Sequence, residues 1–337
     1  MEVLLSGTAG RPEPGCRCVS CLSCDGLPAG PRRPFEVLVD GRVPFPFADV
    51  PPGYRAWGGG LGLTGPDGGT LLCVPPGLEL PADLPDRLDL VLIDLLDRPE
   101  RLGRLRRTHP AAAAVAVGLD HRIRSEAELD RRLRLWGALS VPDGTVLRTP
   151  ATGAGHRAGH RAGHRAGRRA LLLGGSRSGK SAEAELRLAA EPYVTYVATG
   201  PGGAGDGEWA ARVRAHRERR PAHWDTVETT DLVAVLSGAT TPLLVDGLGT
   251  WLAAVFDEHG AWEGDRAPVL RRCDELVAAW RQAPQAVVAV SDEVGMGVVP
   301  ATASGRAFRD ALGRLNERLA AESEYVALVV AGRVLEL

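Results

Sequence analysis

A glycine-rich run that ends in lysine and serine is the part of the sequence that most clearly indicates chemistry. It reads Gly174-Gly175-Ser176-Arg177-Ser178-Gly179-Lys180-Ser181 and matches the pattern G-x-x-x-x-G-K-[ST]. The run follows an apolar strand pattern and precedes a helical one, which is the context that this pattern requires. Glycine turns let backbone N–H groups surround a phosphate, Lys180 can reach the β- and γ-phosphates, and Ser181 can hold Mg²⁺. The sequence therefore predicts a nucleotide site here.

A phosphate-binding loop of this kind needs a second acid, at the end of a neighbouring strand, to orient the metal ion. The run Pro242-Leu243-Leu244-Val245-Asp246 supplies an apolar strand that ends in a carboxylate. We expect Asp246 to hold Mg²⁺ together with Ser181. Two alternatives stay open: Asp246 can instead cap the helix that follows it, and the acidic pair Asp292-Glu293 follows another apolar run.

A histidine lies among arginines on a predicted helix that ends at Pro221. Arg212, His216 and Arg220 recur at i, i+4 and i+8, so they share one face of that helix. A neutral imidazole can attack a phosphorus centre while guanidinium groups stabilise the charge on the phosphates. A solvated basic face is the alternative, and spacing alone favours it.

The elements that must position these residues follow an alternating pattern. After residue 169, short apolar runs of strand type alternate with longer helical runs, which is typical of an α/β domain with a mostly parallel sheet. We therefore predict a P-loop nucleotide-binding domain over residues 170–337. The expected strands are 170–173, 193–198, 242–245, 286–290 and 325–330, and the expected helices are 181–190, 208–219, 248–258, 268–282 and 306–322.

A low-complexity tract precedes this domain. The unit Gly-His-Arg-Ala begins at Gly155, recurs at Gly159 and Gly163, and then degrades. Glycine at every fourth position, without an apolar stripe, cannot repay the entropy of ordering by burial. We therefore interpret residues 151–169 as a flexible linker of Gly, His, Arg and Ala. Residues 1–150 are predicted to form a smaller, loop-rich α/β accessory domain.

Length and composition bound the possible functions. A chain of 337 residues fits two domains, and 44% apolar with 24% charged residues is typical of a globular protein. The formal charge of −2 gives no overall field that favours nucleic acid or an anionic membrane. No apolar run reaches the ~20 residues of a membrane span, and the first residues lack the pattern of a secretory signal. We expect a cytoplasmic protein without a nucleic-acid partner.

Five motifs in the second half resemble the bifunctional adenosylcobinamide kinase / adenosylcobinamide-phosphate guanylyltransferase family of cobalamin biosynthesis. They occur in the family's order and span essentially the whole second domain. They are the glycine-rich loop, Tyr196-Val197-Ala198-Thr199-Gly200, the block from Arg212 to Trp224, Glu293-Val294-Gly295-Met296-Gly297-Val298-Val299-Pro300, and Phe308-Arg309-Asp310 with Gly313-Arg314-Leu315-Asn316.

This resemblance implies two reactions in sequence. The enzyme phosphorylates the hydroxyl of the aminopropanol arm of adenosylcobinamide with ATP or GTP, and then transfers GMP from GTP through a covalent histidine intermediate. The family's histidine falls on His216, which reverses the preference for a solvated basic face. The resemblance also implies a P-loop α/β fold, Mg²⁺ as cofactor and assembly as a homotrimer.

The family's functional residues are carried over position by position. His216 is the expected GMP acceptor, and Lys180 and Ser181 are expected to act in catalysis. This chain departs from the family after the strand-end acid, where Gly247-Leu248 replaces the usual small polar pair. The implied nucleotide contacts are Gly174, Gly175, Ser176, Arg177, Ser178, Gly179, Lys180, Ser181, Ala198, Thr199, Gly200, Arg217, Glu218, Arg219, Arg220, Glu228 and Asp246.

The start of the chain resembles metallo-β-lactamase-like phosphodiesterases over about two dozen residues. The similarity rests on residues 1–8 and on Cys16-Arg17-Cys18-Val19-Ser20-Cys21. Those hydrolases hold their metals with an H-x-H-x-D-H motif, whereas this half has His109 and His121 as its histidines. Without three ligands there is no activated water, so we predict no hydrolase activity in this domain.

Cys16, Cys18, Cys21 and Cys24 lie within nine residues. At this spacing, Cys16, Cys18 and Cys21 can bind one structural Zn²⁺, with either Cys24 or a distant histidine as the fourth ligand. Reduced cysteines without a metal are the alternative, and the sequence does not decide between them.

Two other functions stay open at this point. The first is a P-loop small-molecule kinase without guanylyl transfer, in which His216 only positions a phosphate. The second is a nucleotide-gated regulatory module that contacts nucleic acid through the linker arginines. A stable guanylylated enzyme would exclude the first, and binding that does not change with salt would exclude the second.

Overall fold

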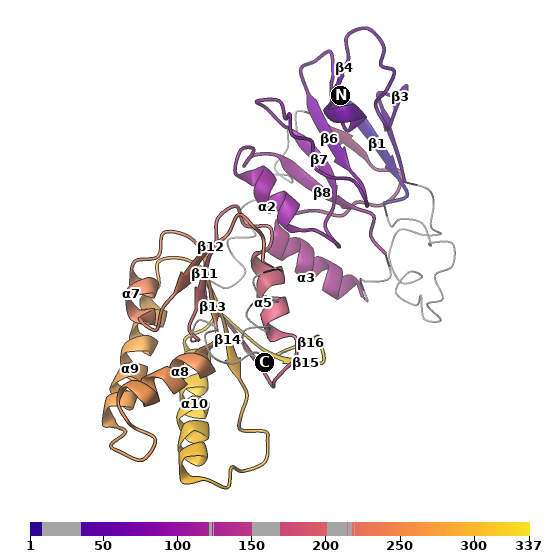
Figure 1. The fold of residues 1–337 in the computed structure, drawn as a ribbon. Helices are drawn as coiled ribbons and strands as arrows, with labels where there is room; N and C mark the ends of the chain where they lie inside the picture. The colour runs from indigo at the N-terminus through magenta and orange to yellow at the C-terminus, as the bar shows by residue number, and fades with distance from the viewer. Residues whose placement is uncertain are drawn as a thin grey trace. The chain divides into compact units, whose positions relative to one another are not determined.

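The computed structural model describes residues 1–8, 35–120, 123, 125–149, 169–200, 214, 218 and 220–337. The chain divides into two compact units (Figure 1), Met1–Gly163 with Ala189–Pro192 and His164–Leu188 with Tyr193–Leu337. The cysteines at 16–24 and residues 151–168 of the expected linker lie outside the described residues. Zinc binding and the linker therefore remain predictions.

The first unit contains two β-sheets that share one apolar core. The first sheet is antiparallel, in the order β3-β2-β1-β9, and the second has the order β4-β5-β6-β7-β8, with β6, β7 and β8 parallel. Their bounds are β1 (Glu2–Ser6), β2 (Glu36–Val39), β3 (Val43–Pro44), β4 (Arg55–Trp57), β5 (Gly62–Thr64), β6 (Thr70–Val74), β7 (Leu90–Asp94), β8 (Ala113–Val117) and β9 (Val146–Arg148). The unit also contains η1 (Gly58–Gly60), α2 (Glu100–Arg106) and α3 (Glu126–Trp136).

The burial of successive residues in these strands shows which faces of the sheets are covered. β1 alternates exposed and buried residues, as expected of a strand with one face on the core. β6 and β7 are buried along their whole length, which fits parallel strands covered on both faces. α3 begins at Ser125, whose side chain accepts a hydrogen bond from the Glu128 N–H, and it ends at Gly137, whose φ is +55°.

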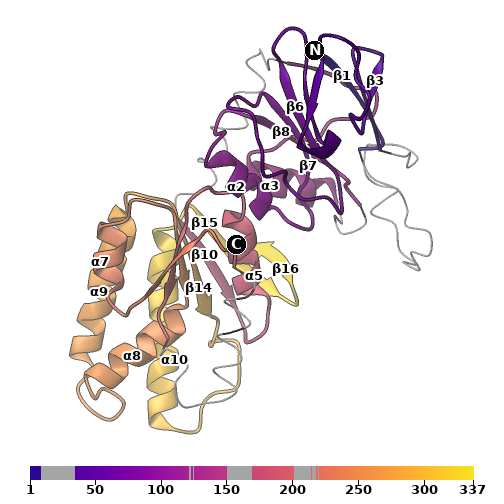
Figure 2. The ribbon, with the colours of Figure 1, turned by 45° about the horizontal axis from the view of Figure 1, so that its top comes forward.

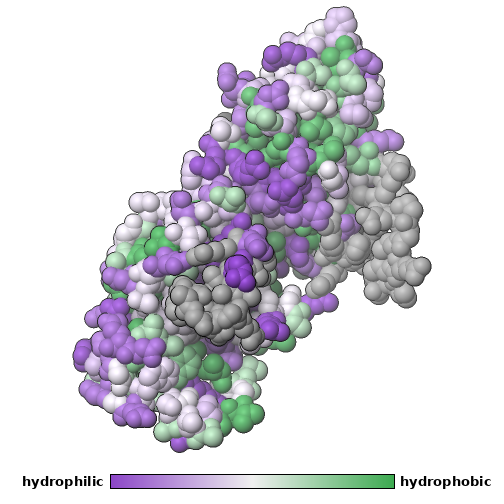
Figure 3. Space-filling model, viewed as in Figure 1, coloured by the Kyte–Doolittle hydropathy of each residue, from purple (hydrophilic) through white to green (hydrophobic). Residues whose placement is uncertain are grey.

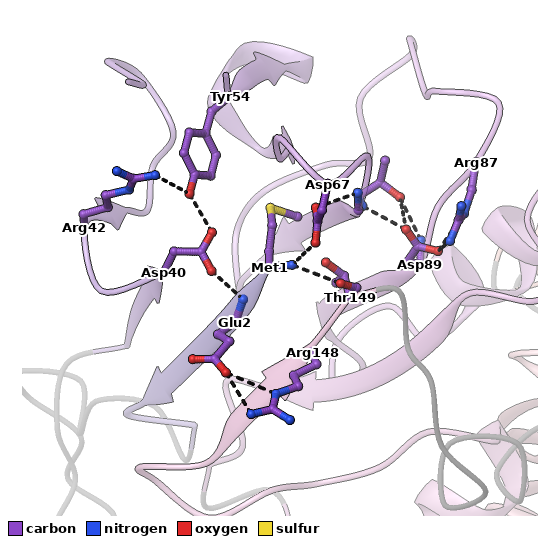
Figure 4. A network of polar contacts seen from close by, with 12 residues as sticks. Met1, Glu2, Asp40, Arg42, Tyr54, Asp67, Arg87, Asp89, Arg148 and Thr149 are labelled. Atoms are coloured by element: carbon purple, nitrogen blue, oxygen red, sulfur yellow. Dashed lines mark hydrogen bonds and ion pairs between the residues drawn. The ribbon is translucent and has the colours of Figure 1, made fainter. Parts of the chain in front are cut away.

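Polar contacts fix the first strand of this unit (Figure 4). The Met1 amino group donates to the Asp67 carboxylate, and to the Thr149 carbonyl at 3.0 Å. The Glu2 N–H donates to Asp40 Oδ1 at 2.7 Å, and the Tyr54 hydroxyl donates to Asp40 Oδ2 at 2.6 Å. These groups satisfy one another, so we interpret the network as structural.

Within the described ranges of the chain, no three His, Cys, Asp or Glu side chains come together as a metal centre would require. His109 is buried, with Nε2 at 2.7 Å from the Pro85 carbonyl oxygen and Nδ1 at 2.8 Å from the Thr108 hydroxyl. His121 lies outside the described residues. The absence of hydrolase activity therefore stays a prediction.

The second unit is built on one seven-stranded sheet with the order β12-β11-β13-β14-β10-β15-β16. All its strands are parallel except β16, which forms an antiparallel pair with β15. The strands are β10 (Arg169–Gly174), β11 (Thr195–Ala198), β12 (Asp225–Glu228), β13 (Leu243–Asp246), β14 (Val287–Asp292), β15 (Tyr325–Val330) and β16 (Arg333–Glu336).

Helices cover both faces of this sheet (Figure 2). Of the helices given in full within the described residues, α5 (Lys180–Leu188) lies on one face and four others lie on the opposite face. Successive side chains of β10 point to opposite faces, so Leu171 and Leu173 join the core under the four helices, whereas Ala170 and Leu172 join the core under α5. The helices are α5 (Lys180–Leu188), α7 (Leu232–Ser237), α8 (Leu248–Glu258), α9 (Ala267–Gln282) and α10 (Ala303–Ala321).

The predicted α/β class with a mostly parallel sheet is confirmed, and each of the five predicted strands is present. The sequence patterns missed β12, whose residues are all exposed, the edge strand β16, and the short helix α7. Of the helix expected over 208–219, only Arg214 and Glu218 lie among the described residues, and both have helical backbone.

Hydrophilic and apolar residues are interspersed on the face that Figure 3 displays. None of the helices in the described part of the chain is both long enough and apolar enough to cross a membrane.

Candidate nucleotide site

The glycine-rich loop joins the buried end of β10 to the beginning of α5. Two of its glycines are required by the geometry. A Cβ on Gly174 would lie 2.5 Å from the Ser178 hydroxyl oxygen and 2.6 Å from the Val329 carbonyl oxygen. Gly179 has a φ of +97°, a conformation that side chains disfavour. The loop is therefore a tight turn whose backbone lies next to the start of a helix, as phosphate binding requires.

Lys180 is held over this loop by a carbonyl and a carboxylate. Its Nζ lies 3.1 Å from the Gly175 carbonyl oxygen and 2.8 Å from Asp292 Oδ1. Asp292 ends β14, the strand next to β10. The Lys180 side chain is 10% exposed and that of Asp292 is 44% exposed. A phosphate that reaches Lys180 must compete with this carboxylate for the ammonium group.

Ser181 and Asp246 lie together although they are far apart in the chain. The Ser181 hydroxyl donates to Asp246 Oδ1 at 3.3 Å, and the Tyr196 hydroxyl donates to Asp246 Oδ2. A hydroxyl beside a carboxylate, next to a phosphate-binding loop, supplies oxygen ligands of the kind that Mg²⁺ takes. The N-cap residue of α8 is Gly247 and not Asp246, and this glycine makes no side-chain hydrogen bond to the helix.

The end of β14 is fixed from two helices. Asn316 on α10 is buried, accepts from the Ser291 hydroxyl at 2.6 Å and donates to the Asp292 carbonyl at 3.1 Å. On α8, a Cβ at Gly249 would lie 2.6 Å from Asp292 Oδ2. Asp292 is thereby held close to Lys180. Asn316, which belongs to one of the five motifs but had no assigned role, is a positioning residue.

The end of β11 contacts the turn after Asp246. The buried Thr199 hydroxyl donates to the Gly247 carbonyl at 2.6 Å, accepts from the Gly247 N–H at 3.1 Å, and lies 2.7 Å from the Thr250 hydroxyl. Leu248 is buried in the core. Gly247 and Leu248 replace the small polar pair that the family usually has at this place. The hydroxyl groups near this turn therefore come from Thr199 and Thr250.

A hollow of about 410 Å³ lies beside β12. Arg220 lies at its wall, with the guanidinium carbon 3.3 Å from the centroid of the Tyr196 ring. Glu228, at the carboxyl end of β12, pairs in register with Ala198 on β11. The described lining residues are Arg220, Pro221, Ala222, Trp224, Thr226 and Glu228.

Comparison with known proteins assigns the family of this site. Residues 170–337 match the family model described as cobinamide kinase / cobinamide phosphate guanyltransferase. The bifunctional adenosylcobalamin biosynthesis protein CobU of Salmonella typhimurium is 40% identical over 178 residues, which cover 48% of this chain and 95% of the relative. The chain belongs to the cobinamide kinase / cobinamide phosphate guanyltransferase family.

Two further relatives agree with this assignment. The protein CobU of Escherichia coli is 36% identical over 177 residues, covering 48% of this chain and 95% of the relative. The protein CobP of Pseudomonas aeruginosa is 42% identical over 170 residues, covering 48% of this chain and 92% of the relative. Both carry the description bifunctional adenosylcobalamin biosynthesis protein.

The structure brings part of the residue set expected for this family together. Gly174–Ser181, Ala198, Thr199 and Asp246 lie at the carboxyl ends of three parallel strands of one sheet, β10, β11 and β13. His216, Arg217 and Arg219 lie outside the described residues, and Glu218 is exposed. Their place in the site therefore stays a prediction, as do the roles of all the residues in the set.

Tyr196 is the neighbour of the site that the residue patterns missed. It belongs to the Tyr196–Gly200 motif, but the residue patterns assigned no role to it. The sequence feature that could have identified Tyr196 is a phenol hydroxyl within a buried strand, because a buried hydroxyl needs a hydrogen-bond partner.

Proposed function

We propose that this protein phosphorylates adenosylcobinamide and then transfers GMP from GTP to adenosylcobinamide phosphate, giving adenosylcobinamide-GDP. One observation carries the proposal. In a chain of the cobinamide kinase / cobinamide phosphate guanyltransferase family, a P-loop presents Lys180 and Ser181 to Asp292 and Asp246, which end two neighbouring strands.

In the kinase step, the loop 174–181 binds the triphosphate through its backbone N–H groups. Lys180 exchanges its contact with Asp292 for the β- and γ-phosphates, where it stabilises negative charge. The substrate hydroxyl oxygen bonds to the γ-phosphorus, the bond from that phosphorus to the nucleoside diphosphate breaks, and the hydroxyl proton passes to water. Ser181 and Asp246 are the residues that would hold Mg²⁺, which when bound neutralises charge on the phosphates.

In the guanylyl step, an imidazole nitrogen of His216 bonds to the α-phosphorus of GTP and pyrophosphate leaves. A phosphate oxygen of adenosylcobinamide phosphate then displaces the histidine and takes the GMP. Arg217, Arg219 and Arg220 supply positive charge near the phosphates in this step. Glu228, together with Ala198 at the end of β11 and the following Thr199 and Gly200, completes the proposed nucleotide contacts.

The proposal includes the setting of the enzyme. Either ATP or GTP serves the kinase step, and the enzyme works in the cytoplasm as a homotrimer. Residues 1–150 are an accessory domain, joined to the second domain by the linker 151–168, because Arg169 already belongs to β10. Cys16, Cys18, Cys21 and Cys24 are the candidate Zn²⁺ ligands of the accessory domain.

The test is labelling with GTP that carries the label in its α-phosphate. We expect wild-type protein with Mg²⁺ to retain label through denaturing separation, and the label to survive base and be lost in acid, as a phosphoramidate would. His216→Ala should carry no label. His259→Ala, which removes an exposed histidine at the end of α8, should label like wild type.

The same protein is then given GTP labelled at the γ-phosphate, with adenosylcobinamide. Transfer of the γ-phosphate without any α-label in the wild type would leave a small-molecule kinase and overturn the guanylyl step. Neither transfer nor label would overturn the whole proposal. Label on His216→Ala would move the covalent step to another residue.

A further inference from the structure

A chain of contacts joins Arg220 to the P-loop through the side chain of Tyr196. The guanidinium carbon of Arg220 lies 3.3 Å from the centroid of the Tyr196 ring, within the range of a cation–π interaction. The Tyr196 hydroxyl donates to Asp246 Oδ2, while Asp246 Oδ1 accepts from the Ser181 hydroxyl. The two carboxylate oxygens of Asp246 therefore have different partners, one on β11 and one on the first turn of α5.

Tyr196 is suited to hold this carboxylate in one orientation. It is 2% exposed and packs in the core between the sheet and α5. A phenol O–H is a hydrogen-bond donor, and here it is directed at Asp246 Oδ2. Because this hydrogen bond restrains rotation of the carboxylate, the other oxygen stays directed at Ser181.

We propose that Tyr196 is a positioning residue that links Arg220 to the carboxylate of Asp246. The proposal rests on the proposed function, in which Arg220 contacts the nucleotide and Asp246 holds Mg²⁺. Partners that hydrogen-bond to a metal-binding carboxylate typically change metal affinity about 10–100-fold when they are removed. Arg220 follows His216 by four residues in the sequence. The link thus connects the segment that carries the guanylyl acceptor to the carboxylate used in phosphate transfer.

The first test compares two tyrosine variants. Tyr196→Phe removes the hydroxyl and keeps the ring under Arg220. Tyr325→Phe is the matched control, because the Arg187 guanidinium carbon lies 3.9 Å from the Tyr325 ring centroid and the Tyr325 hydroxyl has no hydrogen-bond partner among the described residues. Mn²⁺ is titrated into the full chain at saturating GDP, and free Mn²⁺ is followed by electron paramagnetic resonance.

We expect Tyr196→Phe to bind Mn²⁺ about 10–100-fold more weakly than wild type. Its affinity for GDP in EDTA should stay within about twofold, because no nucleotide contact is removed. Tyr325→Phe should match wild type in both measurements. Equal Mn²⁺ affinity in Tyr196→Phe and Tyr325→Phe would overturn the proposal.

The second test measures the link itself. Arg220→Gln is made in wild type and in the Tyr196→Phe background, again at saturating GDP. We expect Arg220→Gln to weaken Mn²⁺ binding about fivefold or more in wild type, and less than about twofold once the hydroxyl is gone. An equal loss in both backgrounds would mean that Arg220 and Asp246 are not linked through Tyr196. A protein that never becomes guanylylated would overturn the proposed function without changing these metal affinities, so the two failures are distinguishable.

Discussion

At the scale of single residues, the phosphate site depends on one ammonium group. Lys180 is the one lysine in a sequence of 337 residues, which otherwise has arginine and histidine as its basic side chains. A lysine ammonium is a compact point charge, whereas the planar guanidinium group needs more room and a different geometry. In this site the ammonium lies within hydrogen-bonding distance of a loop carbonyl and of Asp292. This confined position explains why lysine occurs here.

A lysine-specific reagent therefore reports on a single side chain of this protein. Lys180 is nearly buried, so we expect trinitrobenzenesulfonate to modify it slowly, and ATP or GTP with Mg²⁺ to slow that reaction further. Mass spectrometry of the digested protein checks both expectations.

The variant Lys180→Arg tests whether the site requires an ammonium group. It keeps the charge but not the shape, and we expect γ-phosphate transfer to fall at least about 100-fold, as on loss of a phosphate-stabilising group. Activity close to that of wild type in Lys180→Arg, or no protection of Lys180 by nucleotide, would contradict this account of the site.

At the scale of elements, the site lies where parallel strands end, but its precision comes from helices that pack behind it. Asn316 connects α10 to the last two residues of β14 through two hydrogen bonds. Gly249 lets the first turn of α8 approach Asp292. These contacts make the position of the Asp292 carboxylate a property of three elements.

Asn316→Ala should therefore destabilise the second unit. It leaves the Ser291 hydroxyl and the Asp292 carbonyl without this partner in a buried place, which costs about 2–3 kcal/mol. Urea unfolding followed by circular dichroism measures the change. Glu317→Ala, an exposed position next to it on α10, should change the free energy of unfolding by less than about 0.5 kcal/mol. Equal stability of the two variants would show that Asn316 does not fix β14.

At the scale of the whole molecule, the family match and the candidate site share one half of the chain. The match begins at residue 170, and the relative from Salmonella typhimurium is covered over 95% of its length by 48% of this chain. The first unit has its own two sheets and its own apolar core. No residue of the candidate site comes from its sheets.

A shortened chain of residues 168–337 is therefore expected to become labelled by GTP carrying the label in its α-phosphate, within about twofold of the full-length protein. Circular dichroism first establishes that the shortened chain is folded. A folded but unlabelled shortened chain would mean that the first unit contributes to the site.

The sequence alone determined the local features of this protein. The loop 174–181, the strand-end carboxylate of Asp246 and the five main strands of the second unit are visible in the pattern because glycine turns and apolar runs depend on neighbours in sequence. It also missed particular elements. β12 has no apolar run. α7 is a capped helix of about one and a half turns, and its stability comes from its packing on α9.

The tertiary structure decided which side chains meet. Ser181 and Asp246 are 65 residues apart, Tyr196 and Asp246 are 50 apart, and Asp292 reaches Lys180 from a different strand. The P-loop pattern led us to expect Ser181 beside Asp246, but no spacing in the sequence encodes the other two pairs, because they depend on strand order and register. The order β11-β13-β14-β10 brings the four strand ends to one edge of the sheet. Short sequence motifs thus determined the type of chemistry. The packing of the sheet and its helices determined which side chain each functional group contacts.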